Sequence, residues 1–323
     1  MATITNKYSL VEQQKRINPD GSLAKVVETL DWETGGIFSD FPWLGSNDTW
    51  TNKTVRRASL SAGTWRKLNK GISPGNSSTT EVLDVIGMLC EYLKQDKAYV
   101  DTMPNPGVYR TTEANAFMVG LMQTLVSTLI YGNANADPDK MHGIAARLNA
   151  IDGEYVFDNG GTGSDLTSIY VVTPGELESH FIYPKNAPNT GINHINKGVM
   201  TIQDSDSLDY EAYVDYFEIK CGFVVRDPRS LGRIANIETA GSSNIFNEDN
   251  LIKLINNMKI SSGTRIYMNE TLISQAQIML KDKSNVNWQP ADGLSGITPM
   301  TFSGIPVRKI SKQLLLNTES AVA

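Results

Sequence analysis

The most constraining feature of the sequence is an uncharged stretch of 23 residues, 114–136. From Thr111 to Tyr131 its apolar side chains recur at helical spacing, and they cover most of the circumference of the predicted helix. The side chains on this broad face are Phe117, Met118, Leu121, Met122, Leu125, Val126, Leu129 and Ile130. At 1.5 Å per residue such a helix is roughly 30 Å long. A helix that is apolar on so many sides must be covered by other elements or by lipid.

Polar side chains within this stretch favour a protein core over a membrane. They interrupt it too often for a hydrocarbon environment, at Asn115, Gln123, Thr124, Ser127, Thr128, Asn133 and Asn135. The first ten residues lack the cationic start and apolar run of a signal peptide. Two cysteines far apart, Cys90 and Cys221, are too few for a disulfide framework and fit a reducing cytoplasm. The helix is therefore expected to be buried, and no membrane partner is expected.

Charge is distributed unevenly along the chain. Residues 46–73 contain six cations against one acid, Asp48, for a net +5. Since the whole chain carries −6, the remainder carries −11. A protein that bound nucleic acid through its overall charge would be basic. Overall charge therefore disfavours nucleic-acid binding, and only this one segment supports it.

The basic segment has the composition of strands. Thr49-Trp50-Thr51 and Thr54-Val55 favour a first strand, and Thr64-Trp65 favours a second after a turn at Ala62-Gly63. The predicted two-stranded arm has almost no apolar face, and a lone hairpin is marginal in water. It therefore needs another surface on which to lie. The residues expected to make this contact are Trp50, Lys53, Arg56, Arg57, Trp65, Arg66, Lys67 and Lys70.

Two partners suit this arm. Cations beside tryptophans can form a platform for single-stranded nucleic acid. The alternative is docking on the acidic remainder of a neighbouring copy, and the −11 balance makes this the simpler interpretation.

The rest of the chain mixes strands and helices, which predicts an α+β fold of about two domains. Residues 1–40 are polar and read as an arm. Residues 79–90 are ambiguous between strand and helix. In 216–226 apolar side chains alternate with polar ones, as in a half-buried strand. Asn247 is expected to cap a helix whose first turn is acidic. Gly132 is expected to end the long helix in a left-handed conformation.

The sequence contains no recognisable chemical motif, so no metal, cofactor or active site is expected. The three histidines, His142, His180 and His194, lack metal-ligand spacing. The acids at 204–211 do not follow the calcium-loop order, and the glycines at 160–163 lack a phosphate-loop continuation. A hydrolase that uses an unrecognised carboxylate pair stays open as a distant alternative.

The order of several short motifs carries a resemblance that covers about residue 35 to the C-terminus. In chain order these motifs are Thr64-Trp-Arg-Lys-Leu-Asn-Lys-Gly71, Arg110-Thr-Thr-Glu-Ala-Asn-Ala-Phe117, Tyr131-Gly-Asn133, Pro138, His142-Gly-Ile-Ala145, Gly160-Gly-Thr-Gly163, Tyr183-Pro-Lys185, Arg233-Ile-Ala-Asn-Ile237, Gly304-Ile-Pro-Val307 and Thr318-Glu319. No single motif is decisive, and the specificity lies in their order and spacing. The chain closely resembles the major capsid proteins of short-tailed bacteriophages, which have the Hong Kong 97-type fold.

The resemblance implies a domain organisation. It consists of an N-terminal arm at 1–40, an extended β-hairpin loop at 41–78, and a peripheral domain at 79–240. That domain has a spine helix at about 108–131, with Phe117, Leu121, Leu125 and Leu129 in its core, and a long sheet. An axial core at 241–303 and a C-terminal strand and tail at 304–323 follow. In some members the corresponding strands come after the axial core, whereas here the strand block at 165–237 precedes it.

The resemblance also implies a function. The expected protein assembles with itself, as hexamers and pentamers, into the icosahedral head shell around a double-stranded DNA genome. A separate scaffolding protein, a portal protein and a decoration protein are the other implied partners, and contact with packaged DNA is non-specific. The expected location is the virion, after assembly in the cytoplasm of a host bacterium. An encapsulin-like nanocompartment is the nearest alternative, and a nucleic-acid-binding protein is a more distant one.

Overall fold

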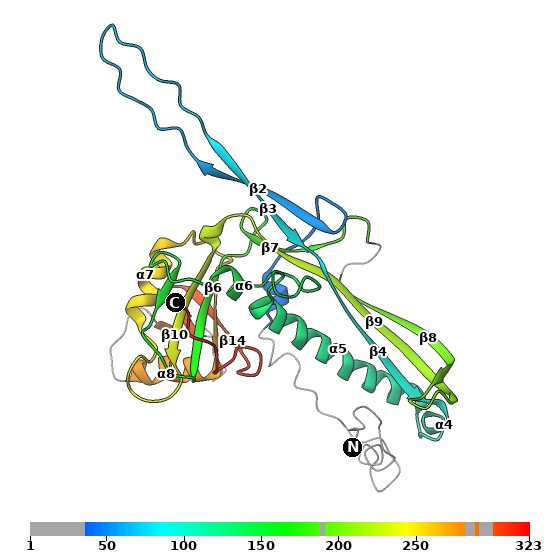
Figure 1. Cartoon of the computed structure of the whole chain (residues 1–323). Helices are drawn as coiled ribbons and strands as arrows, with labels where there is room; N and C mark the ends of the chain where they lie inside the picture. The colour runs from blue at the N-terminus through cyan, green and yellow to red at the C-terminus, as the bar shows by residue number, and fades with distance from the viewer. Residues whose placement is uncertain (1–35, 188–190, 282–287, 291–299) are drawn as a thin grey trace. The chain divides into compact units, whose positions relative to one another are not determined.

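The computed structural model describes residues 36–187, 191–281, 288–290 and 300–323, which form an α+β fold (Figure 1). The chain divides into two compact units. The smaller unit contains residues 89–124 and 191–219, and the larger contains the described residues of 31–88, 125–190 and 220–323. Three elements, β4, α5 and β9 (bounds below), contribute residues to both units.

A mixed sheet forms the centre of the larger unit. Among the described residues its strand order is β12-β13-β14-β11-β6-β10-β5. The strands are β5 (Val156–Asp158), β6 (Leu166–Val172), β10 (Leu231–Glu238), β11 (Arg265–Asn269), β12 (Trp288–Pro290), β13 (Met300–Phe302) and β14 (Ile305–Ile310). β6 is antiparallel to both β10 and β11, whereas β14 runs parallel to β11. Every residue of β6 is buried, which explains why its sequence shows no polar alternation.

Two helices pack on this sheet, α7 (Glu248–Asn257) and α8 (Glu270–Lys281). Leu251 and Leu254 of α7 and Leu272 of α8 are fully buried in one cluster with side chains of β6, β10 and β11. The predicted cap is present, because the Asn247 side chain accepts a hydrogen bond from the Asp249 N–H at 2.9 Å. A 3-10 turn, Pro228–Ser230, leads into β10.

The sheet does not follow the predicted domain boundary between residues 240 and 241. β6 and β10 precede that boundary and β11 follows it, yet β6 pairs with both. The two units are also discontinuous in sequence. The contiguous ranges predicted for the peripheral and axial domains therefore cut across the hydrogen bonding of the sheet.

The predicted hairpin is present, but its second strand lies elsewhere. β2 (Thr51–Ser59) pairs antiparallel with β3 (Ser78–Val85), from Thr51 opposite Val85 to Ser59 opposite Ser78. The strand expected at Thr64-Trp65 and the turn at Ala62-Gly63 are wrong, because residues 60–77 form an open loop (Figure 1). β2 and β3 pair only at the base of the hairpin, so the basic residues near position 66 belong to no strand.

The start of the described chain is part of the larger unit. Residues 1–35 of the predicted arm lie outside the described residues, but 36–40 do not behave as an arm. The short helix α3 (Ile37–Asp40) buries Ile37, and Asp40 pairs with Arg308 at 2.7 Å. β1 (Trp43–Gly45) then runs parallel to β7 (Ser179–Tyr183).

The long helix α5 runs from Pro106 to Tyr131, close to the bounds predicted for the spine helix. In the smaller unit its first turns pack with β4 (Gly87–Asp96) and β9 (Asp209–Val225) through Leu93, Leu121 and Phe217. β8 (Ile192–Gln203) pairs with β9 along its whole length, and α4 (Lys97–Val100) follows β4. As predicted, apolar side chains of β9 alternate with more exposed ones between Tyr216 and Cys221. The predicted alternation does not continue to Arg226, because every residue from Gly222 to Val225 is buried.

The end of α5 differs from the prediction in its cap. Gly132 has no positive φ, so it is not a left-handed cap. An added Cβ at Gly132 would lie 2.4 Å from the Thr128 carbonyl oxygen and 2.5 Å from that of Met141. Gly143 donates its N–H to the Gly132 carbonyl at 2.8 Å, just before α6 (Ile144–Arg147). Glycine is therefore required here for the close approach of two backbone segments.

Candidate assembly surface

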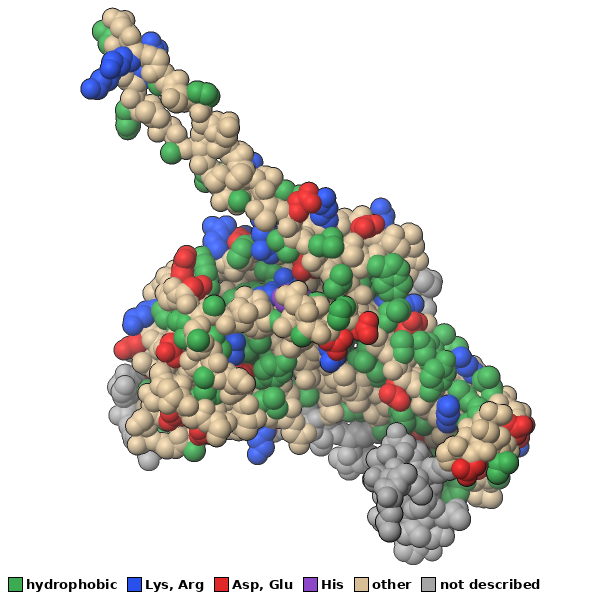
Figure 2. Space-filling model, in the orientation of Figure 1, with side chains coloured by type: hydrophobic (Ala, Val, Ile, Leu, Met, Phe, Trp, Pro, Cys, Tyr) green, Lys and Arg blue, Asp and Glu red, His purple; other side chains and the backbone are tan. Residues whose placement is uncertain are grey.

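The end of the hairpin is the most exposed part of the larger unit. Every residue from 60 to 77 is exposed, and Trp65 is 100% and Leu68 91% accessible. A turn at Asn69, with φ of 60°, brings the Arg66 guanidinium to the Lys70 carbonyl at 2.7 Å. Figure 2 shows Lys and Arg side chains near this end and acidic side chains only nearer the base. Several exposed apolar side chains gathered in one segment are typical of a surface that contacts another molecule.

Four of the predicted contact residues form this end or flank it. Trp65, Arg66, Lys67 and Lys70 lie on the open loop, which we call the hairpin tip (residues 60–77). The tip carries three cations and no acid.

The other predicted contact residues lie along the strands, with partners in their own chain. Lys53 pairs with Glu81 across the two strands at 2.8 Å, and Arg57 donates to the Ser77 hydroxyl at 2.8 Å. The Lys220 ammonium lies 5.9 Å from the Trp50 ring. These exposed contacts stiffen the hairpin only slightly, since an exposed ion pair contributes about 0–1 kcal/mol.

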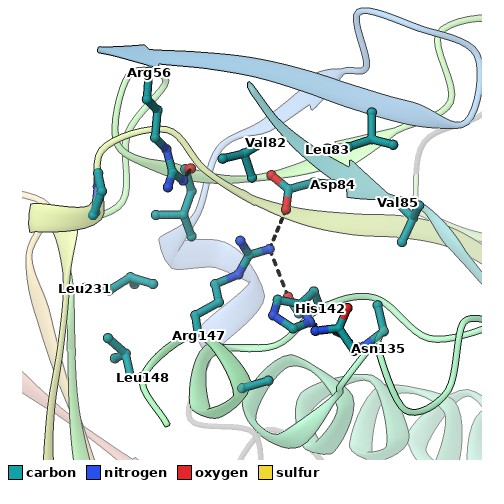
Figure 3. Close-up of a pocket in the computed structure, with 14 residues that line it drawn as sticks. Arg56, Val82, Leu83, Asp84, Val85, Asn135, His142, Arg147, Leu148 and Leu231 are labelled. Carbon is teal, nitrogen blue, oxygen red and sulfur yellow. Dashed lines mark hydrogen bonds and ion pairs between the residues drawn. The ribbon is translucent and has the colours of Figure 1, made fainter. Parts of the chain in front are cut away.

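Arg56 makes contacts within its own chain that the sequence did not predict. Its guanidinium points inward from β2 (Figure 3). It donates to the backbone carbonyls of Val225 and Arg226, the latter at 3.0 Å. Burial lowers the pKa of Arg56, and the nearby Asp84 carboxylate opposes that shift. Because its Nε and Nη2 groups donate to carbonyls of its own chain, Arg56 anchors the base of the hairpin.

A second arginine ties β3 to the same region. Arg147 of α6 donates to Asp84 on β3 at 2.7 Å and to the His142 carbonyl at 3.2 Å (Figure 3). It also donates to the Phe223 carbonyl on β9 at 2.9 Å. Asp84 is almost fully buried, with 3% of its side chain exposed. The two arginines border a pocket of about 460 Å³ that His142 also lines. Burial, followed by the charge of Arg147, lowers the pKa of His142, so this imidazole is neutral at pH 7.

The spine-helix residues are buried in the two units. Leu121 is 5% exposed, Leu125 3% and Leu129 fully buried. Phe117 is half-buried, and its ring stacks on Phe217 at 6.4 Å between centroids. By length and composition α5 would also suit a membrane, and within the described ranges it is the one such helix. One face of α5 packs within the protein through Leu121, Leu125 and Leu129, whereas Met118 and Met122 are half-buried.

Sequence reasoning missed one buried polar cluster, centred on Glu319. The Glu319 carboxylate accepts hydrogen bonds from Arg233 at 2.8 Å, from the Tyr131 hydroxyl at 2.6 Å, and from Ser168. Burial and the Glu319 charge raise the pKa of Tyr131, which stays protonated and donates. The sequence could have indicated Arg233, because it is a cation inside an apolar strand pattern. It could not indicate the partner of Arg233, because Glu319 lies in a segment that resembles an ordinary polar tail.

Among the residues that the structure describes, no group of three or more His, Cys, Asp or Glu is arranged to hold a metal ion. His194 lies 3.0 Å from Asp215, which also pairs with Arg110. The Asp204 carboxylate accepts backbone N–H groups of Asp206 and Leu208 and so closes the β8–β9 turn.

A long helix, a mixed sheet covered by two helices, and an exposed hairpin together define the class of shell-building proteins with the Hong Kong 97-type fold. Comparison with a chain from the near-atomic structure of bacteriophage Epsilon15 supports this class, with 26% identity, a TM-score of 0.74, and coverage of 100% of this chain and 99% of that one. A family model described as Major capsid protein GP7 matches residues 18–323, and the chain belongs to this family. It is therefore a structural, shell-forming protein of a bacteriophage capsid.

More distant similarities also occur. The capsid of bacteriophage JBD30 has 13% identity and a TM-score of 0.45, with 95% of each chain covered. The holo-SrpI encapsulin complex from Synechococcus elongatus PCC 7942 has 10% identity and a TM-score of 0.47, covering 72% of this chain and 97% of that chain. No curated protein sequence matches this chain.

Proposed function

We propose that copies of this chain assemble, as hexamers and pentamers, into the icosahedral head of a short-tailed phage that encloses double-stranded DNA. The hairpin tip is the observation that carries this proposal. Trp65 and Leu68 are exposed in the single chain, while Arg56 and Arg147 anchor the base of the hairpin. An anchored arm with an uncovered apolar end suits a contact between copies, since burial of that end stabilises the assembly.

The two units suggest a division of roles. We assign the axial domain to the larger unit's mixed sheet with α7 and α8, and the peripheral domain to α5, β4, β8 and β9. This revised assignment keeps the strands of the seven-stranded sheet in one domain, which the contiguous ranges did not.

Further partners follow from the proposed assembly. A separate scaffolding protein would guide shell formation, a portal protein would occupy one vertex, and a decoration protein would bind the outside. Assembly would take place in the cytoplasm of the host bacterium. Outside residues 46–73 the chain carries −11, so we expect packaged DNA to be a neighbour that the shell does not bind strongly.

We also propose that the protein has no catalytic role. The carboxylate with the most polar neighbours, Glu319, is fully engaged with Arg233, Tyr131 and Ser168. Three partners hold the carboxylate in one position, which suits a structural role better than proton transfer.

Removal of the hairpin tip tests the proposed assembly. In the test variant Ala62–Gly75 is replaced by Asn-Gly, which suits a tight hairpin turn. The expected result is a folded subunit, judged by circular dichroism, that no longer forms shells in electron micrographs. Normal shells from this variant would contradict the role of the tip.

Two further measurements separate the alternatives. Wild-type particles of the size of a phage head support the proposal, whereas small cargo-filled compartments support the encapsulin alternative. A salt-dependent gel shift with single-stranded DNA, lost on removal of the tip while shells still form, would support nucleic-acid binding.

A further inference from the structure

A pocket lies beside the base of the hairpin, within the larger unit. Its volume of about 460 Å³ is within the range of small-molecule sites, roughly 300–1,000 Å³. The charged residues of its lining are Arg56, Asp84 and Arg147, and His142 beside them is neutral. Two guanidiniums against one carboxylate leave the lining with a net charge of +1, which favours an anion.

Two polar atoms of this lining are buried without a hydrogen-bond partner among the described residues, the Oδ2 of Asp84 and the Nε of Arg147. The other oxygen of Asp84 accepts from Arg147 at 2.7 Å, and only 3% of the Asp84 side chain is exposed. Buried polar atoms are nearly always paired, because an unpaired one has lost its contact with water. A ligand that suits this pocket must therefore accept at Arg147 and donate at Asp84.

Further donors belong to the same lining. Arg56 uses its Nε and Nη2 on two backbone carbonyls, and its Nη1 has no partner in the part of the chain that the structure describes. His142 accepts the Ala134 N–H at its Nδ1, so the neutral imidazole carries its proton on Nε2. Figure 3 shows Arg56, Asp84 and Arg147 around one hollow. Its donors suit the oxygens of a small oxyanion.

The buried acceptor on Asp84 discriminates among oxyanions. Guanidinium groups bind phosphate, sulfate and carboxylate groups alike. Sulfate, carboxylates and the phosphodiesters of DNA carry no proton at neutral pH, so each would meet the Asp84 carboxylate as a like charge. Inorganic phosphate keeps a proton at neutral pH, and a phosphomonoester loses its last proton only near pH 6. The P–OH group of either can donate to the Oδ2 of Asp84.

The pocket has room for more than a phosphate group. Leu148 and Leu231 lie together on one side of it (Figure 3), and Val225 also lines it. A small apolar substituent on the phosphate therefore fits this side of the pocket.

We propose that this pocket binds a phosphate group that carries a proton, as inorganic phosphate or as a small phosphomonoester. The anionic oxygens of the ligand accept from Arg56 and Arg147, and its P–OH group donates to Asp84. Because these residues belong to β2, α6 and β3, the bound phosphate joins both strands of the hairpin to the rest of the larger unit. The site is complete within one chain, so phosphate binding does not depend on shell assembly.

Titration calorimetry of the unassembled full-length subunit tests the site. The probes are inorganic phosphate, phenyl phosphate, sulfate and dimethyl phosphate, at matched ionic strength and about pH 6, where a phosphomonoester still holds part of its last proton. We expect inorganic phosphate, phenyl phosphate or both to bind about tenfold or more tightly than the other two probes, which cannot donate to Asp84. Tighter binding of phenyl phosphate identifies a phosphomonoester as the ligand, and tighter binding of inorganic phosphate identifies the free ion. No binding of either, or sulfate bound as tightly as phosphate, would overturn the proposal.

Substitutions test the selectivity of the site. Asp84→Asn replaces the acceptor by an amide that can donate, so this variant should bind sulfate about as tightly as phosphate. Arg56→Gln removes one guanidinium and should weaken phosphate binding about tenfold or more. Arg57→Gln is the matched control, because Arg57 is the exposed neighbour outside the pocket, and it should bind phosphate as the wild type does. An Asp84→Asn variant that folds and still rejects sulfate would contradict the role of Asp84.

Hydrogen exchange of the wild-type subunit locates the ligand without any substitution. The phosphate probe that binds more tightly should slow amide exchange in β2 and β3, and sulfate at the same ionic strength should not. Exchange that slows only in the hairpin tip would place the phosphate on the exposed cations there, and unchanged exchange would remove the link to the hairpin. Either result would overturn the site.

Discussion

Arg233 and Glu319 form a salt bridge of 2.8 Å although they are 86 residues apart, and each side chain is only 5% exposed. Arg233 lies in the middle of β10, and Glu319 lies in the C-terminal segment beside β6. A second contact holds the same segment, since the Asn236 side chain both donates to and accepts from the backbone of Val322 at 2.9 Å. The C-terminal segment is therefore a fixed part of the larger unit.

We expect Glu319→Leu to destabilise the subunit by about 3–5 kcal/mol, because it leaves the Arg233 guanidinium buried without its counter-charge. Chemical denaturation of the unassembled subunit measures this loss. The double variant Arg233→Met/Glu319→Leu removes both charges and should recover much of it. A double variant as unstable as the single one would contradict the ion-pair explanation.

Truncation of the spine helix should be equally costly. Leu121→Ala and Leu129→Ala each remove a buried side chain from α5, and the expected loss is about 2–5 kcal/mol. Val108→Ala serves as the control, because Val108 is on the same helix and 55% exposed. Equal unfolding midpoints for Leu121→Ala and Val108→Ala would show that this face of α5 is not buried.

Two adjacent arginines should respond differently to the same change. Arg56→Glu places a carboxylate against the carbonyls of Val225 and Arg226, and we expect a loss of about 1.5–3 kcal/mol in subunit stability. Arg57→Glu should change stability by less than about 0.5 kcal/mol, because Arg57 is exposed and its guanidinium donates to the exposed Ser77 hydroxyl. Thermal melting of the two variants measures the difference, and equal melting temperatures would contradict the inward anchoring of Arg56.

The two cysteines should differ in reactivity. Burial raises the pKa of Cys221 to about 12, whereas Cys90 is exposed. A thiol reagent at pH 8 should therefore label one cysteine in the native subunit and both after unfolding, which mass spectrometry can count. Rapid labelling of Cys221 in the native subunit would show that this part of β9 opens readily.

The same thiol predicts a pH dependence of stability. Because the folded pKa lies above the ordinary value of 9.0, the unfolded chain loses this proton first as the pH rises. The contribution of Cys221 is thus fully present below about pH 9 and is lost progressively between about pH 9 and 12. Cys221→Ala should show a shallower loss of stability across this range in denaturation curves.

Local patterns determined much of the secondary structure. The apolar repeat from Thr111 to Tyr131 indicated α5 nearly to its ends, and alternation indicated the strand after Tyr216. Asn247 was recognisable as a cap because its side chain bonds only two residues away. Each of these depends on neighbours within a few positions, so the sequence alone was sufficient to predict it.

Pairing between distant segments was decided by the tertiary structure. Residues 79–90 were ambiguous because a strand is specified by its partner as well as by its own period, and β3 became a strand through pairing with β2. The direction of Arg56 and the partner of Arg233 depend on contacts with Val225 and Glu319, at separations of 169 and 86 residues. Composition predicted a basic arm in need of a surface, but the path of the chain decided which cations anchor it and which stay exposed at its tip.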